Sequence, residues 1–240
     1  MDYIKDALEV NKSALTRTIK SLKYFPAIVL AILVMVVGNM VGLVISAYLS
    51  QVVPSIVSGI ILYIIDVITM SILMSCLYSV IVGSRLNVKN FTQGWQRYIS
   101  PLMATRFIFW IIEMVIGMVP VFGPISYILS IALSVLMSPM LETVYIDGES
   151  GVNALMSIIN FLKDNVVQWI PVAVVIGFLF TILNSYIGLG ILFLYDIKLL
   201  LTMVASMFAL AFVYIYKGHL YDILHDSSMR KRKFQGVFDR

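Results

Sequence analysis

Residues 26–50 read PAIVLAILVMVVGNMVGLVISAYLS, a run that contains no charged side chain. A helix needs about 20 consecutive apolar residues to cross the hydrocarbon core of a bilayer. Inside that core the backbone must satisfy its own hydrogen bonds, which a helix does along its length. Five further apolar runs follow, so the sequence predicts six membrane-spanning helices. Their approximate ranges are 26–50, 56–82, 101–121, 123–143, 168–187 and 191–217.

The composition is that of a membrane protein. The 240 residues are 60% hydrophobic and only 12% charged, with a mean hydropathy of +0.97. Ordinary soluble proteins are about a quarter charged, so this composition excludes a soluble domain. The predicted spans use most of the chain and leave no room for a second domain. We therefore expect residues 1–240 to form a single all-α, polytopic integral membrane domain.

The distribution of basic residues predicts the topology. Most of them lie in three places: Lys5, Lys12, Arg17, Lys20 and Lys23 before the first span, Arg85, Lys89 and Arg97 in the second connection, and Lys217, Arg230, Lys231, Arg232, Lys233 and Arg240 in the tail. The fourth connection adds Lys163, and Arg106 and Lys198 lie inside predicted spans. The turns near Pro54, Pro120 and Gly188 carry no charge. Basic connections stay on the cytoplasmic side, so we expect a multi-pass protein of the cell membrane with both termini in the cytoplasm. Residues 218–240 form a basic tail suited to anionic headgroups, so the net charge of +4 does not indicate nucleic-acid binding.

The segments before the first, third and fifth spans have apolar residues at helical spacing. Such spacing gives each segment one apolar face, and beside a bilayer a helix of this kind lies in the interface. We predict three amphipathic helices in the cytoplasmic interface, the first within residues 1–25. Each leads to a proline, at Pro26, Pro101 and Pro171, and proline is tolerated in the first turn of a helix. The recurrence predicts a threefold repeat of interfacial helix, span, outer turn and span.

Small residues four apart occur in several predicted spans. They are Gly38 and Gly42 in the first, Ser71, Ser75 and Ser79 in the second, and Ser126, Ser130, Ser134 and Ser138 in the fourth. This spacing lets helix backbones approach closely in lipid, so we predict helix–helix contacts at these residues. The alternative is a hydroxyl-lined polar path between the second and fourth spans.

Charged side chains inside the spans are the candidate ion or proton site. Asp66 and Glu113 lie near the middle of the second and third spans, and Arg106 is two turns before Glu113. A charge at the bilayer centre costs roughly 2.5–3.5 kcal/mol on insertion scales, and such residues often mark ion or proton paths. The alternative is that these side chains form hydrogen bonds that hold helices together.

The connection after the fourth span is acidic, with Glu142, Asp147 and Glu149. Acidic residues contribute little to orientation, so the predicted topology is unaffected. Pro139 is expected to kink the fourth span just before this point. An acidic turn that contains glycine can bind a cation or a basic segment, so these three acidic residues are a candidate cytoplasmic partner contact. The alternative is an ordinary loop.

The sequence contains no Gly-rich phosphate loop, serine nucleophile motif, paired-histidine metal motif or cysteine pair. Its histidines, His219 and His225, cluster with Asp222 at a spacing that matches no metal motif. Its single cysteine, Cys76, lies in the second span. We therefore expect no metal site, no cofactor and no enzymatic activity.

Two short stretches share their order of residues with a known class of proteins. They are Ser138-Pro139-Met140-Leu141-Glu142 to Asp147 with Ala154-Leu155, Ser157 and Asn165, and Phe91, Gly94 and Trp95 before the third span. Both resemble uncharacterised prokaryotic six-helix membrane proteins, a class that includes YciC-like proteins and the membrane domain of some glycerophosphodiester phosphodiesterases. The resemblance implies a membrane module without a catalytic role of its own. The soluble phosphodiesterase domain is not part of this sequence, so that activity is not carried over.

The function predicted from these features is that of a non-enzymatic integral membrane module, which acts through the lipid bilayer or through a membrane-protein partner. The alternative function is a small-solute or ion transporter that uses Asp66 and Glu113.

Overall fold

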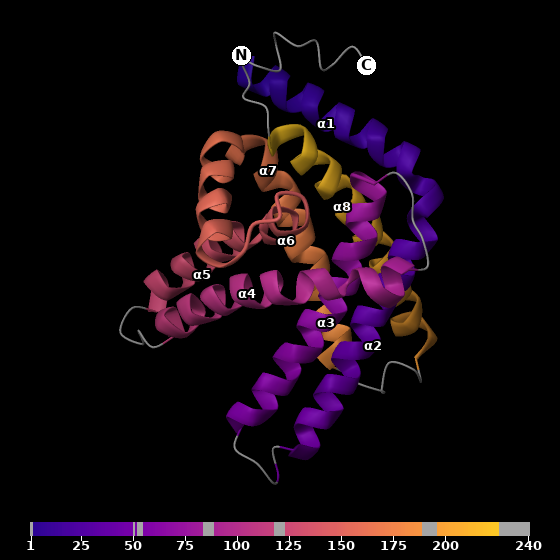
Figure 1. The fold of residues 1–240 in the computed structure, drawn as a ribbon, viewed down its shortest axis with the longest axis vertical. Helices are drawn as coiled ribbons and strands as arrows, with labels where there is room; N and C mark the ends of the chain where they lie inside the picture. Colours follow the sequence, from indigo (N-terminus) through magenta and orange to yellow (C-terminus); the bar gives the residue numbers. More distant parts are fainter. Residues whose placement is uncertain are drawn as a thin grey trace. The chain divides into compact units, whose positions relative to one another are not determined.

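The computed structural model describes residues 2–49, 51, 55–83, 89–117, 123–188 and 196–225. Every regular element in these ranges is a helix (Figure 1). The elements are α1 (Asp2–Ser21), the 3-10 helix η1 (Leu22–Tyr24), α2 (Phe25–Leu49), α3 (Ser55–Ile81), the π-helix η2 (Asn90–Gly94), α4 (Gln96–Gly117), α5 (Gly123–Met137), α6 (Met140–Tyr145), α7 (Gly151–Gly188) and α8 (Ile197–His225). Six helical stretches are long and apolar enough to cross a membrane, which confirms the prediction of an all-α chain with six candidate spans.

The regular α-helix is interrupted shortly before each of three prolines. The 3-10 helix η1 precedes Pro26, and the π-helix η2 precedes Pro101. Inside α7, Asn165 has non-helical dihedral angles of φ −129° and ψ 16°, a few residues before Pro171. Proline has no backbone N–H to donate, so it suits the first turns of a new helical segment.

The predicted fourth span is also interrupted. Its helix ends at Met137, and Ser138 and Pro139 form a turn before α6 begins at Met140. The kink expected at Pro139 is therefore a full break between two helices. Pro139 itself has φ −91° and ψ 6°, outside the helical region. The short helix α6 therefore does not continue α5, and its polar side chains are positioned independently of that helix.

The chain divides into two compact units, each with its own internal contacts. Unit 1 comprises Met1–Leu22, Ser100–Val175 and Ile215–Arg240. Unit 2 comprises Lys23–Ile99 and Ile176–Tyr214. Unit 1 thus includes α1, α5, α6 and the last turns of α8, whereas unit 2 includes α2 and α3.

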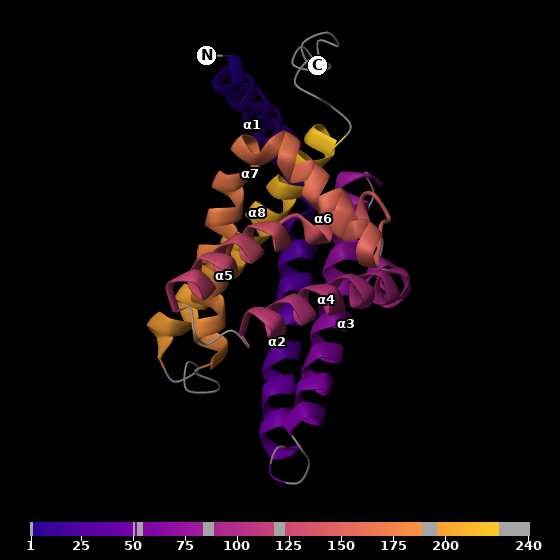
Figure 2. The same ribbon diagram turned by 90° about the vertical axis from the view of Figure 1, so that its left-hand side faces the viewer.

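In unit 2, α2 and α3 lie side by side, as both views of the ribbon show (Figure 1, Figure 2). Two glycines of α2 allow this approach. A Cβ atom built at Gly38 would lie 2.5 Å from Thr69 Cγ2, and one at Gly42 would lie 3.0 Å from Leu62 Cδ2. Helix contacts of this kind supply much of the association energy in lipid. Gly38 and Gly42 thus lie where α2 and α3 approach each other closely.

The serines of the predicted packing stripes separate into two groups. Ser71, Ser75 and Ser79 on α3 are buried, as helix contact requires. Ser130 and Ser134 on α5 are exposed, so the prediction that they lie against another helix is wrong within the chain. The Ser134 hydroxyl donates to the Ser130 carbonyl of its own helix at 2.9 Å, which satisfies it without a neighbour. A larger residue at position 134 is therefore not expected to overpack the fold.

The two remaining serines of the α5 stripe have different outcomes. Ser138 lies in the turn after α5, where its hydroxyl accepts a hydrogen bond from Trp169 of α7. The side chain of Ser126 lies outside the described residues, so its predicted helix contact stays a prediction.

Candidate functional site: a buried polar cluster in unit 1

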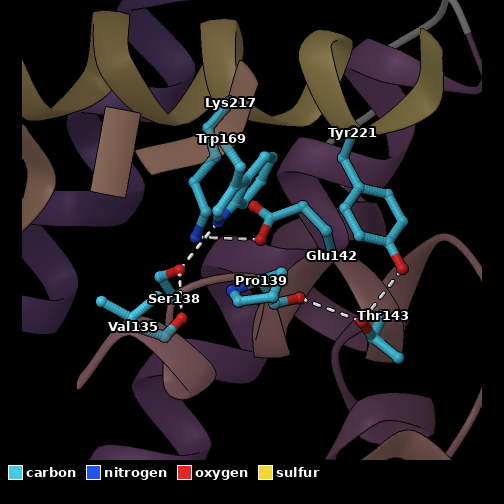
Figure 3. Close-up of polar contacts among 8 residues, drawn as sticks. All are labelled: Val135, Ser138, Pro139, Glu142, Thr143, Trp169, Lys217 and Tyr221. Atoms are coloured by element: carbon cyan, nitrogen blue, oxygen red, sulfur yellow. Dashed lines mark hydrogen bonds and ion pairs between the residues drawn. The ribbon is translucent and has the colours of Figure 1, made fainter. Parts of the chain in front are cut away.

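One face of the end of α8 carries three polar residues at a spacing of four: Lys217, Tyr221 and His225. Residues four apart lie on the same side of a helix. All three point to α6 and the turn that follows it, where they contact Glu142, Thr143 and Asp147. We call these six residues and the neighbouring Ser138 and Trp169 the polar cluster. Figure 3 shows six of these eight residues, all except Asp147 and His225, with Val135 and Pro139.

The centre of the polar cluster is an ion pair. Lys217 Nζ lies 2.9 Å from Glu142 Oε2, and the two side chains are only 3% and 0% exposed. Bringing both charges out of water costs several kcal/mol each, so the pair is viable only because each group has the other beside it. If one partner is removed, the other is left as an uncompensated buried charge.

Trp169 of α7 encloses the ion pair from one side. Lys217 Nζ lies 5.8 Å from the centre of the Trp169 ring, within the range of a cation–π contact. The Trp169 indole Nε1 donates to Ser138 Oγ at 2.7 Å, and Trp169 is fully buried. Ser138 and Glu142, on either side of Pro139, thus bind Trp169 and Lys217 respectively (Figure 3).

A second group of contacts continues toward the end of α8. The Tyr221 hydroxyl donates to Asp147 Oδ2 at 2.6 Å and lies 3.0 Å from Thr143 Oγ1. His225 Nδ1 lies 3.2 Å from the other oxygen of Asp147, Oδ1. The Tyr221 ring stacks on Phe161 of α7, with ring centres 4.4 Å apart. The turn after α6 is thus tied to α8 through Asp147.

The opposite side of α8 binds α1. Arg17 Nη1 lies 2.9 Å from Asp222 Oδ2, and Ser21 Oγ lies 2.8 Å from His219 Nε2. Tyr216 donates to the side-chain oxygen of Asn11 on α1. The polar side chains in the last three turns of α8 are therefore divided between α1 on one side and the polar cluster on the other.

The structure corrects the interpretation of the acidic connection. Glu142 is fully buried and the Asp147 side chain is 6% exposed, so neither is presented to a cytoplasmic partner. Their contacts are Lys217, Tyr221 and His225 of the same chain. The reason is that α8 supplies the cation and the donors, which local sequence does not reveal. Glu149 is half-buried, and its proposed partner contact stays a prediction.

The carboxylates expected to form an ion or proton site belong to different units. Asp66 lies in unit 2 and is half-buried, whereas Glu113 lies in unit 1 and is exposed. Arg106 is also in unit 1 and is half-buried. A shared site for these three residues therefore stays a prediction.

The sequence does not identify Thr143, Trp169 or Tyr221 as site residues, and its charge pattern places Lys217 with the basic residues of the tail. The spacing of four between Lys217, Tyr221 and His225 is the signal that marks a shared polar face. His219, Asp222 and His225 do not converge, because they contact Ser21, Arg17 and Asp147 respectively. Among the described residues, no group of three metal-ligating side chains is positioned to hold an ion.

Comparisons with models of protein families, with curated proteins and with solved structures found no match. The family resemblance suggested by the sequence therefore remains a prediction.

Proposed function

We propose that this chain is a non-enzymatic module of the cell membrane, which acts through anionic lipid or a membrane-protein partner and has both termini in the cytoplasm. In this proposal the polar cluster fixes the ends of the helices of unit 1. We call its action through anionic lipid the lipid-facing role. The observation that supports this role is the arrangement of side chains around α1.

Helix α1 has three distinct faces. Its buried face is Asp6, Val10, Ala14, Thr18 and Ser21. A second face is apolar and outward: Leu8, Leu15 and Ile19 are 67%, 42% and 56% exposed. The exposed lysines Lys12 and Lys20 lie on the remaining surface. A helix with an outward apolar stripe beside basic residues binds an anionic membrane surface, with the stripe among the acyl chains.

A similar exposed apolar surface precedes the third proline-led span. The first part of α7 exposes Val152 and Met156, each 62% exposed, and it ends at the break at Asn165. The π-helix η2 holds the corresponding place before α4. We propose that all three segments lie in the cytoplasmic interface, as parts of a threefold repeat of interfacial helix, break and proline-led span.

Spin labels on α1 test this placement. In a Cys76→Ala background, a nitroxide at Leu15→Cys is expected to be more accessible to oxygen, which concentrates in lipid, than to a water-soluble nickel complex. A label at Thr16→Cys, which is exposed but lies off the apolar stripe, is expected to show the reverse order. The measurement is made on the full chain in vesicles that contain phosphatidylglycerol. Equal access of the nickel complex to both labels would place the stripe in water and contradict the proposal.

The transport alternative is favoured by one observation, the exposure of Glu113 on the apolar helix α4. A carboxylate in such a span is costly unless it meets water or a partner. If the residues are structural, Asp66→Asn and Glu113→Gln should fold normally in liposomes and change no ion or proton flux, because an amide keeps similar hydrogen bonds. A cation or proton flux present in the parent protein and lost in folded variants would support transport instead.

A further inference from the structure

The end of α3 and the π-helix η2 meet in unit 2 at an unusually close contact. A Cβ atom built at Gly94 would lie 2.5 Å from Ser75 Oγ, so a side chain there would require at least the Ser75 hydroxyl to move. The contact fixes η2 against α3. Tyr78 of α3 lies three residues after Ser75, and Arg97 of α4 lies three residues after Gly94. These two side chains contact each other.

The Arg97 guanidinium lies against two aromatic rings, on adjacent sides of the group. Its Cζ atom lies 4.4 Å from the centre of the Tyr78 ring and 4.5 Å from that of the Tyr98 ring. The two ring centres are 6.4 Å apart. Each ring face attracts the cation, and stacking restricts the orientation of the guanidinium before any ligand arrives. A positioned cation loses less conformational entropy on binding than a free one.

Most of the hydrogen-bond donors of this guanidinium have no partner among the described residues. Arginine has five N–H donors in a plane, and one of them goes to the Tyr98 hydroxyl. No carboxylate among the described residues pairs with Arg97, which is exposed. This contrasts with Arg17 and Lys217, whose charges are matched by Asp222 and Glu142. An oriented guanidinium with unused donors in its plane matches the geometry of a phosphate, which it can bind through two parallel hydrogen bonds.

We propose that Arg97, positioned by its contacts with Tyr78 and Tyr98, binds a phosphate group, either that of an anionic lipid headgroup or free phosphate. The inference rests on the proposed lipid-facing role and specifies a binding site for it. Trp95 lies in the same connection, and tryptophan is enriched at the level of lipid headgroups.

Thermal unfolding of the full chain in a neutral detergent tests the proposal. Three additions are titrated separately: short-chain phosphatidylglycerol, short-chain phosphatidylcholine and sodium phosphate at constant ionic strength. Stabilisation by phosphatidylglycerol beyond that given by phosphatidylcholine is expected if the site takes a lipid phosphodiester. Stabilisation by sodium phosphate alone would identify free phosphate as the ligand of the same site. If neither addition stabilises more than phosphatidylcholine, the proposal is wrong.

Variants separate this site from general surface charge. Arg97→Lys keeps the charge but loses the planar fork, and it is expected to weaken the ligand-dependent shift at least tenfold in apparent affinity. Lys89→Gln is the matched control, because it removes a charge from the same connection and is expected to leave the shift unchanged. Equal weakening in both variants would indicate diffuse attraction and overturn the proposal.

A variant that retains the arginine covers the case in which Arg97→Lys fails to fold. Tyr78→Leu removes one stacking ring and is expected to weaken phosphate binding while the charge stays in place. An unchanged ligand-dependent shift in Tyr78→Leu would contradict the stacked site. These results are independent of the spin-label measurement on α1, because α1 and Arg97 belong to different units.

Discussion

Replacing Lys217 with methionine is expected to destabilise the protein by about 3–5 kcal/mol. Methionine preserves most of the volume of the side chain, so the loss comes from the charge. Glu142, fully buried, would be left without the cation that lies 2.9 Å from it. The free energy of unfolding can be measured by titration with a denaturing detergent, followed by tryptophan fluorescence, because Trp169 lies against the ion pair.

The double variant Glu142→Leu/Lys217→Met shows how much of the loss in stability comes from leaving Glu142 unpaired rather than from losing the ion pair itself. Buried ion pairs replaced by apolar residues of similar volume often give neutral or improved stability, so the double variant is expected to recover most of the loss. Lys163→Met is the matched control, since Lys163 is exposed on α7. A cost for Lys217→Met no greater than that for Lys163→Met would show that the pair contributes little to folding.

Gly38→Ala is expected to cost about 1–3 kcal/mol through overpacking between α2 and α3. The new methyl group would lie 2.5 Å from Thr69 Cγ2. Thr69 cannot simply rotate away, because its hydroxyl donates to the Asp66 carbonyl at 3.1 Å, so rotation would break that bond. The same unfolding measurement in detergent reports the change.

Two further variants control this result. Gly59→Ala on α3 has no atom within 4 Å of the new methyl group, so it should be neutral or should stabilise by up to about 1 kcal/mol. Thr69→Ser removes the clashing methyl group and should restore most of the stability lost in Gly38→Ala. If Gly38→Ala and Gly59→Ala behave alike, the close approach of α2 and α3 is not a source of stability.

The spans and the Gly38 contact could be predicted from sequence because their signals are local. An apolar run of sufficient length determines a span whatever its neighbours are. The serine stripes show the limit of such signals. Ser71, Ser75 and Ser79 have the same spacing as Ser130 and Ser134, yet only the first three are buried. Small residues permit a close approach, but they do not determine whether a neighbouring helix is there.

The polar cluster could not be predicted for a different reason. Its ion pair joins Glu142 of α6 to Lys217 of α8, and neither residue indicates the other in the sequence. The rule that places basic residues on the cytoplasmic side assigned Lys217 to the tail, where a free cation would be expected. The turn at Pro139 is visible in the sequence, but the direction it gives to α6 depends on the tertiary contacts of Trp169 and Tyr221.

The order of Glu142 and Lys217 along the chain has a consequence for biosynthesis. Glu142 is translated well before its counterion Lys217, so during that interval its carboxyl group is either neutral or exposed to water. Helix α1, which is translated before α8, likewise lacks its contacts with Tyr216, His219 and Asp222 until α8 is made. Helix α8 thus supplies both sets of contacts in unit 1, those with α1 and those with the polar cluster. A chain cut short before this point would retain an exposed α1 and a carboxylate without its cation, features by which quality-control proteases could distinguish unfinished copies from finished ones.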